Sequence, residues 1–526
     1  NANPGWPQKT LLRIRAEQLI PSNLGHDNVI RWFKGLIPKT PNGIARLAES
    51  QIKKGKFIEA SKLIKKIWIN GNFGAKQERQ FYSKFRRFIS REDHKARLDR
   101  LLWKGKYYPV RRMYQRVNKS YRELAEARLA LRRMSGGVDR AIKRVPKYLI
   151  SNPGLVYERL RWRRKKGKNK SAQKILENLP LNLSYPMKWW KERVILARRA
   201  LSKKKYREAY FLIKNHGLDE KSRLGYINAE WLAGWIALQF LHKENLAYRH
   251  FLNCYNASNF PISKSRCTYW LGRASYTRGE RAQSQYWYQR SFQNPTTFYG
   301  QLAAAKLIPP RILELPINPN IVNSSGVNAI DPYDLIAVVH LLGKAGIPEI
   351  IGPFIRRLNK LDSSRSWREM VAKLAMFSGR RDLAILTSKI ALREGYDLIH
   401  LGYPVLDFRL RSDLEEAFVW AIVRQESGFH AQAVSHAGAL GLMQILPNTG
   451  IRIAKKNSIP FIRKKAIEDR QYNLRLGQAY LKDLLELFKG SYILTLSAYN
   501  AGPARVKRWI KKAGDPRDPN YDPIDW

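Results

Sequence analysis

The stretch KKGKFIEASKLIKKIW, residues 53–68, has the pattern of a basic pair, a glycine turn and a helix with a small residue in it. Four further stretches share this loose pattern at irregular spacing: residues 103–117, 165–179, 203–217 and 277–291. Glycine occupies the turn in every copy except the fourth, where Lys204 takes its place. Helix–turn–helix units that recur in this way stack on their neighbours into an α-solenoid. The pattern therefore predicts a solenoid through the first three hundred residues.

The composition changes after the last of these copies. Residues 308–334 are rich in Pro, Asn and Ser and lack periodicity, which predicts a linker. Helical patterns resume at residues 334–346, 348–361 and 366–379. A different, tighter domain is expected after residues 402–413.

The length of 526 residues is too great for one compact core, so several domains are expected. We predict an all-α fold with three domains. These are an α-solenoid over residues 1–310, a small helical linker domain over residues 311–398 and a C-terminal domain over residues 399–526.

The formal net charge is +55, from 97 Lys and Arg against 42 Asp and Glu. Such an excess predicts a polyanionic surrounding, which would be nucleic acid, anionic lipid or an acidic cell-wall polymer. A solvated basic surface is the simpler alternative. The basic residues run through the whole chain and do not cluster in one reading element, which disfavours specific nucleic-acid binding. The Lys and Trp content of the N-terminal half is accordingly interpreted as solenoid packing and not as a nucleic-acid channel.

Other features concern the cellular setting. The longest uncharged apolar segments, such as WLAGWIALQFL (231–241), are shorter than the roughly 20 residues that a membrane span needs, so we interpret them as buried helices. Cys254 and Cys267 cannot form a metal site by themselves; they allow one disulfide in an oxidising compartment or two separate buried thiols. The sequence starts at Asn1 without an apolar signal region, which is the pattern of a processed chain.

A candidate catalytic acid lies in AIVRQESGFHAQAVSHAGALGLMQILPNTG, residues 421–450, which contains one glutamate and no aspartate. The capping-box pattern SDLE (412–415) predicts a helix start at Ser412, and the apolar stripe of that helix continues to Glu426 before Gly428 ends it. Partial burial and the negative end of the helix dipole both favour the neutral form of the Glu426 carboxyl group. A carboxylic acid that stays protonated near neutral pH can protonate a leaving oxygen. An ordinary capping or surface glutamate is the alternative.

The downstream segments supply neutral polar groups of the kind that orient sugars. SHAGALGLMQ (435–444) brings three glycines close together, which allows the backbone to approach a ligand, and it ends in the amide of Gln444. LSAYNAGPARV (496–506) offers Tyr499 and Asn500 before a Gly-Pro turn. The sequence has no His, Cys or Asp cluster with metal spacing and no phosphate-binding loop beside them. We therefore expect a site without a metal or other cofactor.

Three segments, RQESGF, SHAGALGLMQILPNT and AYNAGPARVKRW, resemble the signature segments of the lytic transglycosylases with a goose-lysozyme-like catalytic domain. EWLAGWIALQF, SRCTYWLGRA and PTTFYGQLAA resemble the solenoid end of the soluble periplasmic lytic transglycosylases, and LGYPVL resembles their catalytic entry. The resemblance covers nearly the whole chain and is weakest before residue 200. It implies a ring or horseshoe of helices, a small helical linker domain and a lysozyme-like, α-rich catalytic domain.

The resemblance implies an enzyme that cuts peptidoglycan between N-acetylmuramic acid and N-acetylglucosamine. The product would be a 1,6-anhydromuramoyl end, formed mainly by exo-action in cell-wall turnover. Glu426 would be the acid and base, and no second Asp or Glu falls between it and Glu468, whereas usual glycosidases pair two carboxylates. The other site residues that the resemblance implies are Ser427 beside the acid, Ser435, Met443 and Gln444 in the glycan cleft, and Tyr499 and Asn500 beside the reaction centre.

The same resemblance implies a periplasmic protein whose partners are glycan strands with stem peptides. The basic chain would hold the stem-peptide carboxylates through many weak contacts. Machinery for cell-wall synthesis or secretion is a further candidate partner. Family members continue after DPIDW through a segment of the pattern IPF-ET-R-YV, so the resemblance implies that this sequence, which ends at Trp526, stops short of that segment. A hydrolytic lysozyme-like muramidase and a catalytically impaired glycan-binding scaffold are the alternatives.

Overall fold

The structure is a computed structural model that describes residues 5–21, 23–177, 179, 183–219, 222–311, 333–404, 410 and 413–526. Within these ranges the regular structure is helical, and β-structure is limited to isolated bridges. The all-α fold class is thereby confirmed. Contacts divide the chain into two units, which we call the N-terminal unit (Gln8–Ala257) and the C-terminal unit (Ser258–Trp526 together with Asn1–Pro7).

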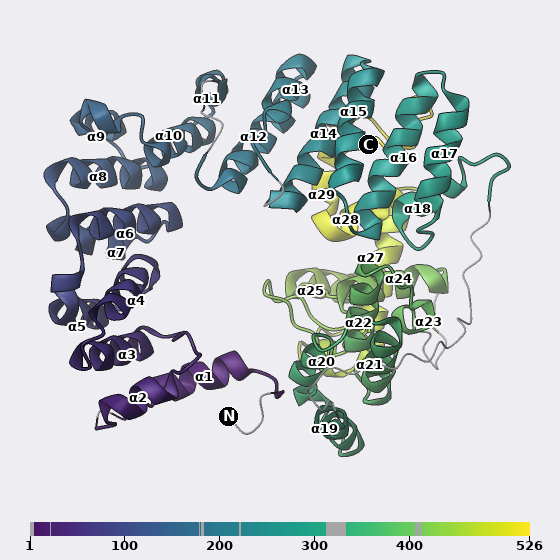
Figure 1. Cartoon of the computed structure of the whole chain (residues 1–526). Helices are drawn as coiled ribbons and strands as arrows, with labels where there is room; N and C mark the ends of the chain where they lie inside the picture. Colours follow the sequence, from purple (N-terminus) through teal and green to yellow (C-terminus); the bar gives the residue numbers. More distant parts are fainter. Residues whose placement is uncertain are drawn as a thin grey trace. The chain divides into compact units, whose positions relative to one another are not determined.

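The N-terminal unit is built from helices that follow one another through short turns (Figure 1). Its α-helices are α1 (Lys9–Gln18), α2 (His26–Trp32), α3 (Pro41–Lys53), α4 (Phe57–Asn70), α5 (Ala75–Phe85), α6 (Arg91–Lys104), α7 (Tyr107–Arg112), α8 (Lys119–Arg133), α9 (Val138–Arg144), α10 (Pro153–Lys165), α11 (Asn169–Glu177), α12 (Pro186–Leu201), α13 (Tyr206–Lys214), α14 (Arg223–Leu241) and α15 (Glu244–Ala257). Short 3-10 helices are η1 (Arg86–Phe88), η2 (Met113–Arg116) and η3 (Lys147–Leu149). Contacts run from α4 to α6, α8, α10 and α12, and then through α13 and α14 to α15. Because each helix packs mainly on near neighbours in the chain, this unit is an α-solenoid, as the sequence predicts.

The turn that recurs in the sequence has the same backbone conformation in every copy. The φ angle is positive at Gly55 (75°), Gly105 (68°), Gly167 (74°) and Gly279 (81°), and Lys204 has 56° in the fourth copy. This left-handed region is open to glycine, whereas a Cβ makes it costly. Each of these residues lies between the end of one helix and the start of the next, so the five related stretches share the same type of interhelical turn.

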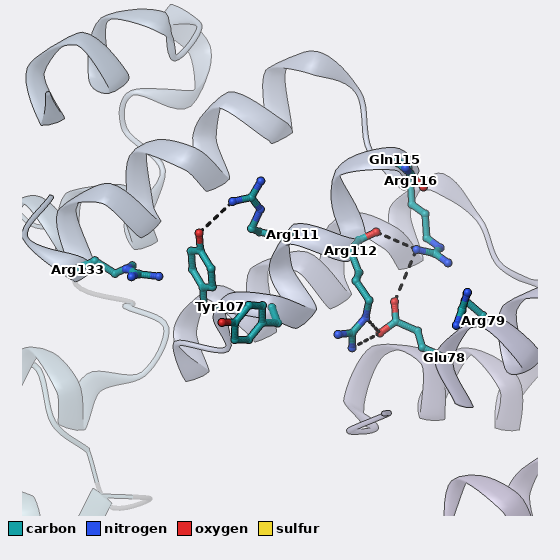
Figure 2. Close-up of a pocket in the computed structure, with 9 residues that line it drawn as sticks. Glu78, Arg79, Tyr107, Arg111, Arg112, Gln115, Arg116 and Arg133 are labelled. Atoms are coloured by element: carbon teal, nitrogen blue, oxygen red, sulfur yellow. Dashed lines mark hydrogen bonds and ion pairs between the residues drawn. The ribbon is translucent and has the colours of Figure 1, made fainter. Parts of the chain in front are cut away.

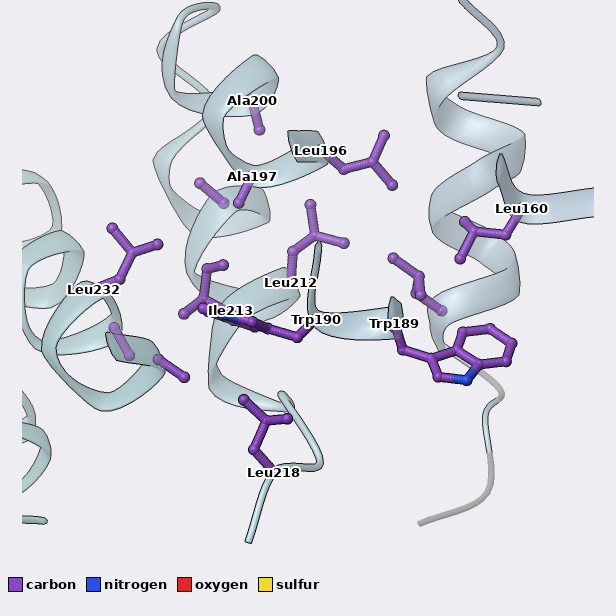
Figure 3. Packing of buried hydrophobic residues seen from close by; sticks show 14 of the residues in the cluster. Leu160, Trp189, Trp190, Leu196, Ala197, Ala200, Leu212, Ile213, Leu218 and Leu232 are labelled. Carbon is purple, nitrogen blue, oxygen red and sulfur yellow. The ribbon is translucent and has the colours of Figure 1, made fainter. Parts of the chain in front are cut away.

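Large apolar side chains fill the space between successive helices of the N-terminal unit (Figure 3). Leu160 on α10, Trp189 and Leu196 on α12 and Leu212 on α13 are at most 1% exposed. Full burial of one such leucine contributes on the order of 1.5–3 kcal/mol. Trp68 is likewise fully buried. These tryptophans serve as packing groups, which agrees with the interpretation favoured from the sequence.

The C-terminal unit contains the remaining helices (Figure 1). They are α16 (Pro261–Thr277), α17 (Arg281–Phe292), α18 (Phe298–Ala304), α19 (Tyr333–Lys344), η5 (Pro348–Ile350), α20 (Gly352–Leu358), α21 (Arg365–Phe377), α22 (Arg381–Arg393), α23 (Ile399–Gly402), α24 (Glu416–Glu426), α25 (Pro447–Lys456), α26 (Lys465–Glu468), α27 (Arg470–Leu487), α28 (Tyr492–Ala501) and α29 (Pro503–Ala513). The three helical segments predicted between residues 334 and 379 correspond to α19, η5 with α20, and α21. Helices α24, α25, α27, α28 and α29 share one hydrophobic core, which supports the candidate site.

Helices α16 to α18 group with the C-terminal half of the chain, although the sequence pattern continues the solenoid through them. Arg273 on α16 forms ion pairs with Asp522 (2.9 Å) and Asp525 (3.2 Å). The hydroxyl of Thr296 donates a hydrogen bond of 2.8 Å to Asp397. These contacts connect the three helices to the rest of their unit. The domain limits at residues 310 and 398 stay a prediction, and most of the expected linker lies outside the described residues.

The cysteines and the apolar helices are buried features. Cys254 and Cys267 are both fully buried, and neither is a free thiol. Of the two states that the sequence left open, the disulfide-bonded one is present. The segment WLAGWIALQFL lies in α14, where most of its residues are buried. Within the described ranges, we find no helix with both the length and the apolar character that crossing a membrane requires.

Candidate active site

Helix α24 carries the candidate acid at its C-terminal end. Ile422 and Val423 are buried in the domain core, and Glu426 follows Ile422 by one turn, so it continues the same helix face. The backbone N–H groups of Ser427 and Gly428 both donate to the carbonyl oxygen of Val423, at 3.0 and 3.1 Å. Gly428 has a φ of 60°, the conformation that commonly ends a helix. The predicted helix end is therefore confirmed.

The start of α24 differs from the predicted capping box. The helix begins at Glu416 with Glu415 at its N-cap, and no side chain in the described part of the chain caps it. Ser412 itself lies outside the described residues. The carboxylate of Glu415 instead accepts a hydrogen bond of 3.1 Å from the hydroxyl of Tyr492, at the start of α28. The predicted helix start at Ser412 was wrong, because residues 413–415 are not helical and the helix begins only at Glu416.

The Glu426 side chain is half-buried, and this burial raises the pKa of its carboxyl group above the usual value for glutamate. Burial removes the water that would solvate the charged form. Among the residues that the structure describes, Glu426 has no hydrogen bond or ion pair to offset this effect. The upward direction of this pKa shift agrees with the expectation from the sequence. Such a group keeps its proton at a higher pH than an exposed glutamate does, which suits a general acid.

Ser427 follows the candidate acid and contributes to the end of the helix. Its hydroxyl donates a hydrogen bond of 3.2 Å to the carbonyl oxygen of Val423. The same carbonyl also accepts from the backbone N–H groups of Ser427 and Gly428. The Ser427 side chain is thus directed back onto the last turn of α24, next to Glu426. Its predicted part in the reaction stays a prediction.

The glycine-rich segment after α24 folds into a compact loop. Isolated β-bridges join Val434 to Leu440 and Leu440 to Ile445. The Ser435 hydroxyl oxygen accepts a hydrogen bond of 2.9 Å from the backbone N–H of Ala439, which closes the first turn of the loop. Ser435 is half-buried and is therefore both a structural acceptor and a partly accessible group.

The side-chain amide of Gln444 holds the same loop together. Its Nε2 donates to the carbonyl oxygens of Ala433 (3.0 Å) and Gly441 (2.8 Å). The backbone of Gln444 has a φ of 49°, which is uncommon for a residue with a side chain. With both amide hydrogens engaged, the Oε1 atom has no partner within the described residues. This oxygen can accept a hydrogen bond from a ligand hydroxyl.

Met443 is held at the centre of the site by both of its backbone groups. Its N–H donates to the Oδ1 atom of Asn473 (2.9 Å), and its carbonyl accepts from the hydroxyl of Tyr499 (2.6 Å). The Met443 side chain is 0% exposed and packs so tightly on Gly477 that an added Cβ there would lie 2.1 Å from the sulfur. The structure thus places this side chain in the core, and its predicted contact with a glycan stays a prediction.

Asn473 on α27 is a positioning residue that the sequence analysis missed. Its amide nitrogen donates to the carbonyl oxygens of Leu440 (3.0 Å) and Ala466 (2.8 Å), while its oxygen accepts from Met443. It is 1% exposed. A signal was present in the sequence, because Asn473 shares a helix face with the apolar stripe through Leu481, and a buried amide needs hydrogen-bond partners.

Tyr499 and Asn500 lie at the C-terminal end of α28. Burial raises the pKa of the Tyr499 hydroxyl well above its usual value, and the nearby charge of Glu426 raises it further. The acid and this tyrosine therefore lie within electrostatic reach of each other. Asn500 is exposed, and its side chain makes no hydrogen bond within the described ranges. The structure thus brings Glu426, Tyr499 and the loop of Met443 together, with Asn500 at the adjoining surface.

The chemistry of this arrangement is that of one carboxylic acid among neutral polar groups. No group of three or more His, Cys, Asp or Glu side chains that could hold a metal ion occurs in the described part of the chain. The raised pKa of Glu426 allows this residue to donate a proton near neutral pH. The neutral amides and hydroxyls around it can hydrogen-bond a polar, uncharged substrate.

Residues 408–521 match the family described as Transglycosylase SLT domain. The C-terminal region is a transglycosylase SLT domain. The match spans α24 to α29 and includes every candidate site residue named above. The resemblance stated from the sequence motifs is therefore confirmed for this region.

Curated relatives agree with this assignment. A soluble lytic murein transglycosylase of Salmonella typhimurium is 37% identical over 99 residues, which cover 19% of this chain and 15% of the relative. A Haemophilus influenzae protein, whose name also describes a soluble lytic murein transglycosylase, is 26% identical over 267 residues. These residues cover 48% of this chain and 44% of the relative. The chain thus spans less than half the length of these relatives in each match.

Two solved structures have a similar fold. The 70 kDa soluble lytic transglycosylase of Escherichia coli matches with a TM-score of 0.66 and 18% identity, over 97% of this chain and 81% of that chain. An inactive Glu-to-Gln mutant of the lytic transglycosylase Slt from Pseudomonas aeruginosa matches with a TM-score of 0.69 and 19% identity, over 96% of this chain and 81% of that chain. At this identity the likeness establishes the fold, a helical superhelix followed by a lysozyme-like α-rich domain.

Proposed function

We propose that the chain is a peptidoglycan lytic transglycosylase. It would cleave the β-1,4 bond between N-acetylmuramic acid and N-acetylglucosamine and form a 1,6-anhydromuramoyl product. The observation that carries this proposal is Glu426, a half-buried acid with a raised pKa inside the segment that matches an SLT domain. The names of the Salmonella and Escherichia relatives, soluble lytic murein transglycosylases, support the same substrate. Exo-action and a role in cell-wall turnover are further parts of the proposal.

Glu426 acts first as a general acid. Its proton passes to the glycosidic oxygen while the bond from that oxygen to C1 of the muramic residue breaks, and the electron pair of this bond goes to the oxygen. The carboxylate then accepts the proton of the C6 hydroxyl of the same residue, whose oxygen forms a new bond to C1. The substrate's N-acetyl group assists between the two steps. Glu426 ends protonated, and no water is consumed.

The surrounding residues would hold the glycan and the acid in place. The Oε1 atom of Gln444 and the exposed amide of Asn500 would hydrogen-bond sugar hydroxyls. Tyr499 would keep the loop of Met443 in position beside Glu426. Within this proposal Ser435 contributes by closing the loop, and Ser427 contributes by fixing the end of α24; these two contacts are intramolecular.

The cellular setting belongs to the same proposal. The disulfide-bonded state of Cys254 and Cys267 supports an oxidising compartment, and for this substrate that compartment is the periplasm. The net charge of +55 supports binding to stem peptides, which carry carboxylates. Machinery for cell-wall synthesis or secretion would be a further partner.

The decisive experiment is mass spectrometry of the products that the full chain releases from purified sacculi in water enriched in oxygen-18. A transglycosylase yields muramoyl ends that are one water lighter than hydrolytic ends and carry no heavy oxygen. A hydrolytic muramidase would place oxygen-18 in the product and would refute the proposal. Binding to sacculi without any released product would instead indicate a glycan-binding scaffold.

A further inference from the structure

A concave site lies in the N-terminal unit, where α5, α7, η2 and the end of α8 meet (Figure 2). Its volume is about 790 Å³, which is within the range of sites that bind small ligands. None of the candidate active-site residues belongs to it. The lining residues are Glu78, Arg79, Tyr107, Tyr108, Arg111, Arg112, Gln115, Arg116 and Arg133.

The floor of this cavity is a buried carboxylate surrounded by arginines. Glu78 is 1% exposed, and its Oε2 atom accepts hydrogen bonds from Arg97 (3.1 Å) and Arg112 (2.8 Å). Its Oε1 atom lies 3.6 Å from a guanidinium nitrogen of Arg116. One negative charge thus faces three positive ones, so the group as a whole carries a positive excess. Because Glu78 anchors these side chains, Arg112 and Arg116 are held in fixed positions at the cavity wall.

The remaining arginines of the cavity have no carboxylate of their own. Arg79, Arg111 and Arg133 are exposed, and none of them forms an ion pair within the described residues. Arg111 donates a hydrogen bond of 3.0 Å to the hydroxyl of Tyr107, and the guanidinium of Arg133 lies 4.3 Å from the centre of the same ring. These contacts orient the two arginines without neutralising them. Figure 2 shows Arg111 and Arg133 beside Tyr107, with Arg79 beside Glu78.

The charges of the side chains that line the cavity predict the sign of the ligand's charge. Five arginines against one glutamate leave a strongly positive cavity. The planar guanidinium group binds carboxylates and phosphates through paired hydrogen bonds. The cavity is therefore suited to a ligand that presents more than one oxyanion group.

Two neutral side chains favour a peptide over a bare inorganic anion. Tyr108 is 75% exposed and offers an aromatic face at the cavity wall. Gln115 is exposed, and its amide can pair with a peptide group because it has both a donor and an acceptor. An inorganic anion would use neither surface, whereas a short peptide with side-chain carboxylates would use both.

We propose that this cavity binds acidic peptides that carry several carboxylates, at a site separate from the SLT domain. The source of such peptides is taken to be the stem peptides of peptidoglycan, and to that extent the inference rests on the proposed function. The cavity would hold the peptide part of the polymer, while the chemistry at Glu426 concerns its glycan part.

The test measures binding by isothermal titration calorimetry with the full chain. The probes are a stem tetrapeptide without glycan, its fully amidated derivative and inorganic phosphate. The cavity variant is Arg79→Gln combined with Arg111→Gln. The matched control is Arg223→Gln combined with Arg249→Gln, which removes the same charge from exposed positions on α14 and α15 of the same unit. We expect the tetrapeptide to bind about tenfold more weakly to the cavity variant, or about 1.4 kcal/mol. The control should bind as the unmodified chain does, and the amidated peptide should not bind.

Each other outcome would overturn the inference. Equal weakening in the control variant would show that net charge alone attracts the peptide. Phosphate that binds as tightly as the tetrapeptide and displaces it would define a general oxyanion site. The probe has no glycosidic bond, so its binding does not depend on whether Glu426 is catalytic. If the product assay refutes the proposed reaction, the result of the binding experiment still stands. If the cavity does not bind the tetrapeptide, the result of the product assay still stands.

Discussion

The hydroxyl of Tyr499 donates a hydrogen bond of 2.6 Å to the backbone carbonyl of Met443. The side-chain oxygen of Asn473 accepts a hydrogen bond from the backbone N–H of the same residue. Residues of α27 and α28 thus bind both backbone groups of Met443 in the glycine-rich loop. Tyr499 also interacts electrostatically with Glu426. One tyrosine therefore both holds the loop and lies near the acid.

Replacement of Tyr499 by Phe should destabilise the protein by about 1–3 kcal/mol. The carbonyl oxygen of Met443, a buried residue, would lose its hydrogen-bond donor. Urea unfolding of the full chain measures this change. The control is Tyr492→Phe, which removes an exposed hydroxyl bonded to Glu415 and should cost at most about 0.5 kcal/mol. Equal losses in the two variants would contradict the structural role of Tyr499.

Glu426→Gln should lower turnover at least about a hundredfold, because the amide has no proton of suitable acidity to give to the leaving oxygen. The shape of the side chain is nearly unchanged, so folding and glycan binding should persist. The rate of muropeptide release from sacculi and sedimentation with sacculi measure the two properties. Glu416→Gln, at the exposed start of the same helix, is the matched control and should keep normal turnover. An active Glu426→Gln variant would remove this residue from the mechanism.

The pH dependence of the rate should show a loss on the alkaline side. Burial raises the pKa of Glu426, so the protonated, active form persists above the usual range of a glutamate and is lost as the pH rises through the raised value. The profile of kcat/KM reports this ionisation in the free enzyme. A rate that stays constant from mildly acidic to clearly alkaline pH would show that the reaction does not need a protonated Glu426.

Gly441→Ala should be much more damaging than Gly438→Ala. Both glycines have positive φ angles, 70° and 81°, so both substitutions incur about 1–2 kcal/mol of backbone strain. At Gly441 a new Cβ would also lie 2.2 Å from the amide nitrogen of Asn473 and 2.5 Å from the carbonyl of Ala466, whereas at Gly438 the space is open. Overpacking adds about 1–3 kcal/mol for Gly441 alone. Thermal unfolding compares the pair, and similar melting temperatures would mean that the loop is not held by Asn473.

Lys204→Gly should stabilise the N-terminal unit by about 1 kcal/mol, because the side chain stands at a φ of 56°. The reciprocal change, Gly167→Ala, should cost a similar amount, since its φ is 74° and nothing lies near the new Cβ. Chemical denaturation of the full chain would show both shifts. The same sign for both substitutions would argue against equivalent turns in the two copies.

Much of the fold follows from local patterns. The turns at Gly55 and Lys204, the helix end at Gly428 and the burial of one face of α24 were all predicted, and the structure agrees. These features depend on the φ preference of single residues and on the periodicity of the helix. Both can be recognised in a short stretch of sequence. The raised pKa of Glu426 was predicted for the same reason, because it follows from the helix face that carries the residue.

Other features were decided only by tertiary contacts. The place of Met443 depends on Asn473 and Tyr499, which belong to different helices. Arg273 on α16 likewise pairs with Asp522 and Asp525, which are far from it in the sequence. The sequence alone determined where helices turn and which face of each is apolar, since those are local properties of the backbone. Which buried polar group meets which partner was decided by the packing of distant helices, because a hydrogen bond requires two atoms to meet in space and no local pattern specifies both.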